Sequence, residues 1–215
     1  MQVLSPLEAR VLGVLFEKQR TTPDVYPLTV NALLAGCNQK TSRHPVMDVA
    51  ESAVQQALDA LKARSLVLES YGASGRVLRF AHNLQKCLGV GDGTAALLAV
   101  LVLRGPQTAA ELRANAERLH RFADLSAVEA YLDEMANWKD GPLVTRLARQ
   151  PGARESRWAH LLCGEVAADS ARTGAPDDRD EVEVLRAEVD ELRAGLAALR
   201  AAIERLAREL GLAAE

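Results

Sequence analysis

The stretch DVAESAVQQALDALKARSLVLESYGASGRVLRF, residues 48–80, contains a change of hydrophobic period that decides the fold. Up to Arg64 its apolar residues recur at helical spacing, and beyond Arg64 the spacing becomes two, which is typical of a strand. Asp48 and Glu51 form a capping pair that predicts the start of the helix. The predicted buried stripe of this helix is Val54, Ala57, Leu58 and Leu61.

After Arg64 we expect a β-hairpin whose turn lies at residues 71–75. Because side chains alternate along a strand, the inner face is predicted to hold Leu66, Leu68, Leu78 and Phe80. The outer face is predicted to hold Val67, Glu69, Val77 and Arg79. A helix followed by such a hairpin is the end of a winged-helix unit, and Arg76 and Arg79 would contact a phosphate backbone from the wing.

Two further helices precede this stretch. Ser5, Pro6 and Glu8 predict the start of a helix that runs to about Arg20. A loop at residues 21–27 then leads to a short helix at about 28–37. Residues 1–88 are therefore predicted to form a first winged-helix domain.

The same order of elements recurs after a connecting stretch at residues 83–93. Apolar periodicity predicts helices at 94–103 and 108–115, and Ser126 with Glu129 predicts the cap of a third helix. Strand-like segments follow at 143–147 and 157–162. We expect a second winged-helix domain at residues 89–165, and hence a mainly α fold with small β-hairpins (α+β), built from two tandem winged-helix domains and followed by a C-terminal coiled-coil helix.

The C-terminal segment carries a heptad pattern. Residues 166–179 are small, polar and proline-containing, which predicts a linker, and residues 180–212 are predicted to form the coiled-coil helix. We infer a parallel homodimer; the alternative is a single amphipathic helix that folds back on its own domains. The predicted coil positions are Val182, Leu185, Val189, Leu192, Leu196, Leu199, Ile203, Leu206 and Leu210.

Composition excludes several classes of protein. The chain has 215 residues, enough for two domains of about 80 residues and an extension. No segment approaches the roughly 18 to 20 uninterrupted apolar residues of a membrane span, and residues 1–10 do not resemble a signal peptide, so we expect a cytoplasmic protein without a membrane partner. Three widely spaced cysteines, Cys37, Cys87 and Cys163, fit a reducing compartment and are predicted to be buried or half-buried.

Sequence motifs of enzymes are not apparent. The four histidines are isolated from metal-like partners, and no nucleophile elbow is present. The glycines at residues 89–93 lack the Lys-Ser/Thr ending of a P-loop, so a flexible link between the domains is the better interpretation. We therefore expect no catalytic residue, no metal site and no cofactor.

Charge is distributed unevenly. Basic against acidic residues number 10 against 7 for residues 1–88, 9 against 10 for 89–165, and 7 against 12 for 166–215. A nucleic-acid binder is usually basic, because neutralising phosphates supplies much of its affinity. Only the first domain leans that way. In the second domain the outer face of the third helix carries Glu129, Asp133 and Glu134, which would repel phosphates.

Two groups of residues are candidates for contacts with DNA. The first lies on the outer face of the helix in residues 48–64 and comprises Ser52, Gln55 and Gln56. The second lies in the segment before that helix and comprises Lys40, Ser42 and Arg43, where amides and bases suit phosphate contacts. The alternative for this segment is structural: Asn, Gln and Arg can cap helix ends and tie an irregular turn to the core.

Several motifs resemble the YceH family of bacterial proteins. The most specific are Cys37, Asn38, Gln39 and Lys40, followed by Arg43 and Pro45. Others lie at residues 4–10, 17–19, 21–23, 26–28, 31–33, 103–108, 111–113, 140–142, 146–149 and 160–161. The resemblance covers residues 1–165 and implies tandem winged-helix domains with a helical tail, without a settled activity. His44 departs from the family, which usually has an acidic residue at this position.

Two classes of function follow from these expectations. The first is a dimeric DNA-binding protein with a regulatory role, in which the coil joins two copies so that weak half-site contacts combine. The second is a scaffold that uses the winged-helix shape to bind another, unidentified protein. The basic, amide-rich first domain favours DNA, whereas the near-neutral charge and the acidic second domain favour the scaffold.

Overall fold

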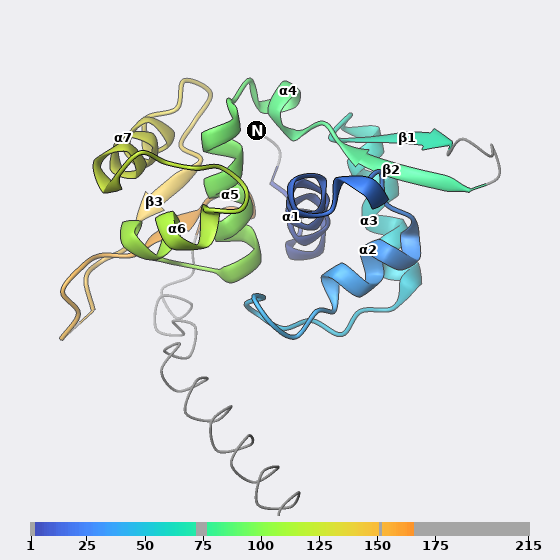
Figure 1. The fold of residues 1–215 in the computed structure, drawn as a ribbon, viewed down its shortest axis with the longest axis horizontal. Helices are drawn as coiled ribbons and strands as arrows, with labels where there is room; N and C mark the ends of the chain where they lie inside the picture. Colours follow the sequence, from blue (N-terminus) through green and yellow to red (C-terminus); the bar gives the residue numbers. More distant parts are fainter. Residues whose placement is uncertain (1–2, 72–76, 151, 166–215) are drawn as a thin grey trace, which may run out of the picture. The chain divides into compact units, whose positions relative to one another are not determined.

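The computed structural model describes residues 3–71, 77–150 and 152–165 (Figure 1). These residues form helices and two small antiparallel strand pairs, which confirms a mainly helical α+β fold. The predicted linker at 166–179 and the predicted coil at 180–212 lie outside the described residues, as does Arg76.

The first half begins with α1 (Pro6–Thr21), which starts as the sequence predicts. The Ser5 backbone N–H donates to Glu8 Oε2 at 2.7 Å, and the Glu8 backbone N–H donates to Ser5 Oγ at 3.2 Å. A 3₁₀ turn, η1 (Pro23–Val25), lies in the predicted loop, and α2 (Val30–Cys37) begins two residues later than predicted because Thr29 caps it. Both capped starts place polar side chains on the orphan N–H groups of a helix end.

The cap predicted for α3 (Glu51–Ala63) is wrong. Ala50 occupies the N-cap position and no side chain caps the helix there. Asp48 lies two residues too early, and Glu51 is the first helical residue, whereas a capping box needs its acid at the third. The predicted stripe of Val54, Ala57, Leu58 and Leu61 is buried as expected.

The first hairpin pairs β1 (Val67–Tyr71) with β2 (Leu78–His82), and Val67 lies opposite His82. The predicted faces of β1 are wrong: Val67 is 2% exposed, whereas Leu68 is 50% exposed. Leu66 is buried, but it precedes the strand, just after Ser65 adopts a left-handed φ of 58°. Val67, and not Leu68, therefore faces the core. On β2 the prediction holds, since Phe80 is fully buried.

The second half repeats this order of elements, after a short helix, α4 (Leu84–Leu88), that was not predicted. Gly89 ends α4 with a left-handed φ of 67°, which a residue without a Cβ adopts at no cost. The repeated elements are α5 (Asp92–Arg104), α6 (Ala109–Ala116), α7 (Leu125–Ala136), β3 (Val144–Arg146) and β4 (Trp158–His160).

The cap of α7 differs from the prediction. Asp124, not Ser126, is the N-cap residue, and its carboxylate accepts from the Ala127 N–H at 2.9 Å. Ser126 instead donates to the same carboxylate at 2.7 Å. An aspartate in extended backbone conformation is a strong cap, so the helix begins one residue before Ser126.

A pair of backbone contacts makes the two halves correspond closely. In the first half, Leu28 pairs with Phe80 through N–H to carbonyl bonds of 3.0 and 2.8 Å. In the second half, Gln107 pairs with Trp158 in the same way, at 3.1 and 2.7 Å. Leu28 immediately precedes the capping residue Thr29, and Gln107 immediately precedes the capping residue Thr108. Both hairpins therefore gain a short third strand contact just before the second helix of their half.

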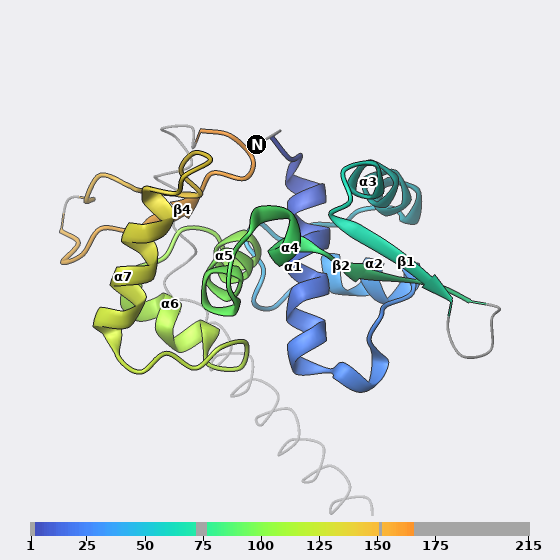
Figure 2. The ribbon, with the colours of Figure 1, turned by 90° about the horizontal axis from the view of Figure 1, so that it is seen from above.

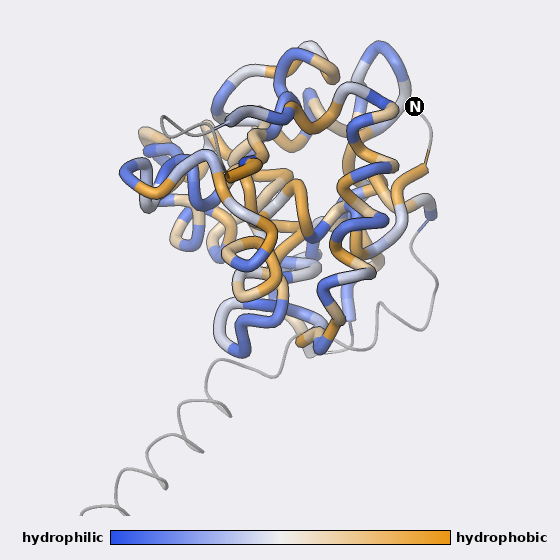
Figure 3. Tube along the Cα trace, turned by 90° about the vertical axis from the view of Figure 1, so that its right-hand side faces the viewer, coloured by the Kyte–Doolittle hydropathy of each residue, from blue (hydrophilic) through white to orange (hydrophobic). Residues whose placement is uncertain are grey.

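The halves are not separate bodies, because they share one hydrophobic core. Helix α1 packs against α5 (Figure 2), and a Cβ on Gly13 would lie 3.0 Å from Leu103 Cγ. The His44 N–H donates to the Leu103 carbonyl at 2.7 Å. Apolar stretches gather in the interior of this body (Figure 3). The predicted boundary at residue 88 thus divides two repeats and not two cores.

Helix α5 lies at the centre of this core. Its residues from Gly93 to Leu103 are all buried, so the helix has no polar face to turn toward water. No helix among the described residues is both long enough and apolar enough to cross a membrane.

Candidate nucleic-acid interface

The segment between α2 and α3 contains most of the family motif, and its side chains are tied to the body of the protein. The Asn38 side chain makes two bonds to one residue: Nδ2 donates to the Val49 carbonyl and Oδ1 accepts from the Val49 N–H, each at 2.9 Å. Gln39 Nε2 donates to the Thr41 carbonyl at 2.9 Å. These amides satisfy the backbone of an irregular turn and fix the point at which α3 begins.

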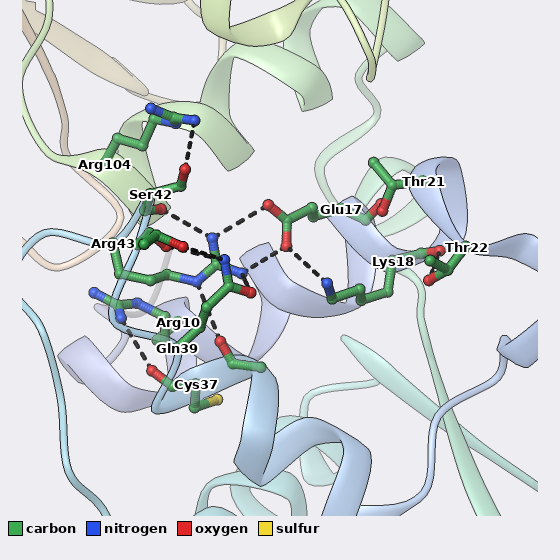
Figure 4. A network of polar contacts seen from close by, with 12 residues as sticks. Arg10, Glu17, Lys18, Thr21, Thr22, Cys37, Gln39, Ser42, Arg43 and Arg104 are labelled. Atoms are coloured by element: carbon green, nitrogen blue, oxygen red, sulfur yellow. Dashed lines mark hydrogen bonds and ion pairs between the residues drawn. The ribbon is translucent and has the colours of Figure 1, made fainter. Parts of the chain in front are cut away.

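Arg43 crosses from this segment to α1 (Figure 4). Its Nη2 lies 2.6 Å from Glu17 Oε2 and its Nη1 lies 3.2 Å from Glu17 Oε1, while Nε donates to the Gly36 carbonyl. The Arg43 side chain is fully buried. A buried guanidinium with a two-point carboxylate partner holds the segment against α1.

A second buried arginine supports the same segment. Arg10 donates from Nη1 to the Cys37 carbonyl at 3.2 Å and from Nη2 to the Pro45 carbonyl at 2.7 Å. Burial, with the nearby charge of Arg43, lowers the pKa of Arg10 from its ordinary value. Burial also raises the pKa of the Cys37 thiol to about 11. Cys37 is therefore an uncharged apolar side chain at neutral pH.

The three predicted contact residues of this segment thus have different environments. Lys40 is exposed. Ser42 is half-buried and accepts a hydrogen bond from Arg104 Nη2 at 2.8 Å. Arg43 is paired with Glu17. Its contacts are therefore those of a residue that ties the turn to the core, which is the alternative to a contact with phosphate. Arg10, Glu17 and Arg104 were not predicted from the sequence to belong to this network. The only signal was that all three residues fall inside motifs of the family.

The outer face of α3 carries the exposed Glu51 at its start, then uncharged polar side chains, and paired charges toward its end. Ser52 and Gln56 are exposed, and the half-buried Gln55 donates to Asp59 Oδ1 at 3.3 Å. Lys62 contacts Asp59 at 2.9 Å and also binds Glu69 of β1. The hydrogen bonds to Glu69 and Asp59 raise the pKa of Lys62. The face therefore offers hydrogen-bonding groups with little net positive charge.

On the β1–β2 hairpin beside α3, the predicted wing cation Arg79 binds backbone carbonyls of the preceding loop. Arg79 is half-buried, and its Nη1 donates to the carbonyls of Pro27 at 2.8 Å and Val25 at 3.3 Å. Three large apolar side chains of this hairpin are exposed instead: Leu68, Tyr71 and Val77. Arg76, the other predicted wing cation, lies outside the described residues.

Behind the hairpin lies a buried histidine. His82 contacts Gln19 through Nε2 at 2.8 Å, and its backbone N–H donates to the Tyr26 hydroxyl at 2.8 Å. Its Nδ1 is buried without a hydrogen-bond partner. Burial, assisted by the charge of Arg20, lowers the pKa of His82 to about 4, and burial raises the pKa of Tyr26 to about 12. The imidazole is therefore neutral in the folded protein at neutral pH.

The corresponding surface of the second half is acidic. Glu129, Asp133, Glu134 and Asn137 are all exposed on or at the end of α7, as predicted. Cys87 is exposed, which corrects the expectation that every cysteine is at least half-buried. Within the described ranges, no three His, Cys, Asp or Glu side chains gather in an arrangement that would hold a metal ion.

The described residues form a mainly helical α+β body with two β-hairpins, and comparison with known proteins gives its family. Residues 4–153 match the family described as "Protein of unknown function, DUF480". A UPF0502 protein of Burkholderia pseudomallei (strain 668) is 58% identical over 216 residues, which cover 99% of this chain and 91% of the relative. A UPF0502 protein of Burkholderia ambifaria (strain MC40-6) is 57% identical over 218 residues, with the same coverage. The chain belongs to this bacterial family, as the motif at residues 37–45 indicated.

Proposed function

We propose that this protein binds double-stranded DNA through its first half and that each half is a winged-helix unit. One observation carries the proposal: Ser52, Gln55 and Gln56 present hydrogen-bonding side chains on the outer face of α3, which packs beside the first hairpin. Glutamine amides suit the major groove because they bind the adenine N6 and N7 atoms at two points. The acidic α7 has no such face, so the contact is assigned to α3 alone.

The described residues of the first half offer few unpaired positive charges, so we expect one copy of the chain to bind DNA weakly. Lys62 and Arg43 are neutralised by carboxylates, which leaves few cations for phosphates. One copy would then bind weakly, and affinity would come from two copies joined through residues 180–212 as the predicted parallel homodimer. A dimer reads two half-sites one helical turn apart, which suits a regulatory role.

The proposal is tested by selecting duplexes of about 30 base pairs from a random pool with the full-length chain, then measuring retention at about 50 and about 200 mM salt. We expect enrichment of a two-fold symmetric sequence. Gln55→Ala with Gln56→Ala should remove the preference, while Glu129→Gln with Glu134→Gln on α7 should retain it. Absence of enrichment, or equal retention by both double variants, would contradict the proposal.

A second candidate is a scaffold that binds another protein, and the exposed Leu68, Tyr71 and Val77 on the first hairpin favour it. Leu68 and Tyr71 lie on opposite faces of the hairpin, so each face offers an exposed apolar side chain to a protein partner. The variant Leu68→Ser with Tyr71→Ser separates the candidates. If the protein is a scaffold, this variant loses a partner that co-purifies with the wild type; if it reads DNA through α3, duplex retention is unchanged.

A further inference from the structure

A small polar pocket lies where elements of the two halves meet, apart from the outer face of α3. Its volume is about 230 Å³. The end of α1 contributes Lys18 and Thr21, the segment before α3 contributes Gln39 and Ser42, the end of α5 contributes Arg104, and the turn after α6 contributes Arg118. The first five of these side chains are visible in Figure 4.

The lining of the pocket carries excess positive charge. Among the described residues that line it, Lys18, Arg104 and Arg118 accompany one carboxylate, Glu17. That carboxylate is bound at two points by Arg43, behind the wall, and Lys18 lies 3.8 Å from it. Counting Arg43, the described residues place four cations around this anion, and hydrogen bonds orient Arg43 and Arg104.

Arg104 and Ser42 fix one wall of the pocket. Arg104 Nη2 donates to Ser42 Oγ at 2.8 Å across the junction of the two halves. Ser42 has a left-handed φ of 58°, and the network around Arg43 holds the backbone of its segment. A guanidinium that is already oriented loses little conformational freedom when it binds an anion.

We propose that this pocket binds a small oxyanion, namely the phosphate group of a small metabolite. Arginine and lysine side chains recognise phosphate oxygens through charge-assisted hydrogen bonds. The volume lies below the roughly 300 to 1,000 Å³ of sites for larger ligands, which limits the ligand to phosphate or a phosphate ester of a few carbon atoms. This inference does not depend on DNA binding, because the pocket shares no residue with the α3 face.

A bound phosphate would link the two halves of the protein at their junction. The ligand would contact α1 and the segment before α3 on one side, and α5 and the turn after α6 on the other. A ligand that binds only the folded state raises its stability. The same contacts would brace the segment that leads into α3.

The test uses inorganic phosphate as the probe and the full-length chain, with sodium chloride at matched ionic strength as the reference. Calorimetric titration should give saturable binding with one phosphate per chain, and the melting temperature should rise by about 2 to 4 °C at saturation. Arg118→Gln and Lys18→Gln should each weaken binding by at least about tenfold. Arg121→Gln is the matched control, since this exposed arginine removes the same charge outside the pocket.

Three outcomes would overturn the proposal. The first is no saturable heat with phosphate. The second is equal weakening by Arg118→Gln and Arg121→Gln, which would show general charge attraction. The third is displacement of phosphate by a short DNA duplex together with loss of duplex binding in Arg118→Gln, which would assign the pocket to the DNA backbone. A failure of sequence-selective DNA binding leaves the phosphate titration unaffected, so the two proposals fail separately.

Discussion

Arg43 and Glu17 form a buried two-point ion pair that joins the segment before α3 to α1. Arg43→Ala removes the charge-assisted hydrogen bonds to Glu17 and the bond to the buried Gly36 carbonyl. We expect it to lower the free energy of unfolding by about 1.5 to 3 kcal/mol. Lys40→Ala, three residues earlier on an exposed side chain, should change it by less than about 0.5 kcal/mol. Urea denaturation measures both, and equal values would show that Arg43 has no structural role.

Gly36 lies so close to α1 that a Cβ there would sit 2.5 Å from Val14 Cγ1. In an open helix Gly→Ala gains about 1 kcal/mol, but overpacking a core costs about 1 to 3 kcal/mol. Gly36→Ala should therefore destabilise the protein. Adding Val14→Ala removes the clashing methyl group, so the double variant should be more stable than the sum of the single effects. Additive effects in the denaturation cycle would refute this close contact.

Asp124 caps α7 in the structure, although Ser126 was predicted to do so. Asp124→Ala should cost about 1 kcal/mol, since it removes the acceptor for the Ala127 N–H. Ser126→Ala should cost less than half of that, because the serine hydroxyl only donates to the same carboxylate. Thermal unfolding of the two variants distinguishes the caps, and the reverse order of effects would restore the original prediction.

His82 makes stability depend on pH. Below its ordinary pKa of 6.5 the unfolded chain takes up a proton on this imidazole, but the folded chain does not until the pH nears 4. The free energy of unfolding should therefore fall as the pH drops from 6.5 to 4, by about 1.4 kcal/mol per pH unit for this group. His82→Gln should have a shallower slope in that window, as measured by urea denaturation at several pH values. Parallel curves for wild type and variant would contradict the burial of a neutral imidazole.

His160 is a second source of the same pH dependence. Burial lowers its pKa to about 4, so it should add a similar slope over the same window. His160→Gln should therefore flatten the slope between pH 6.5 and 4, as measured by urea denaturation at several pH values. Parallel curves for the wild type and this variant would show that His160 is not buried as a neutral imidazole.

Local patterns predicted most of the helices. The capping box at Ser5 and the apolar stripe of α3 depend on residues three or four apart, so sequence alone contains them. The faces of β1 were predicted wrongly because one left-handed residue, Ser65, shifts where the strand begins. A single-residue shift of this kind exchanges the two faces of a strand.

The candidate site was predictable only in part. The exposed amides of α3 follow from helical periodicity, and the structure leaves Ser52 and Gln56 at the surface. The role of Arg43 could not be decided from sequence, because its partner Glu17 lies 26 residues away and charge alone does not reveal a pair. The polar pocket was missed for the same reason, since it draws residues from both repeats.

The shared interior of α1 and α5 limits how this chain can be divided. A fragment that ends at residue 88 would expose the apolar side chains of α1 that pack against α5. The remaining fragment would expose α5, whose residues from Gly93 to Leu103 are all buried in the intact protein. Neither fragment is expected to fold by itself, so the two repeats should unfold together in one cooperative transition.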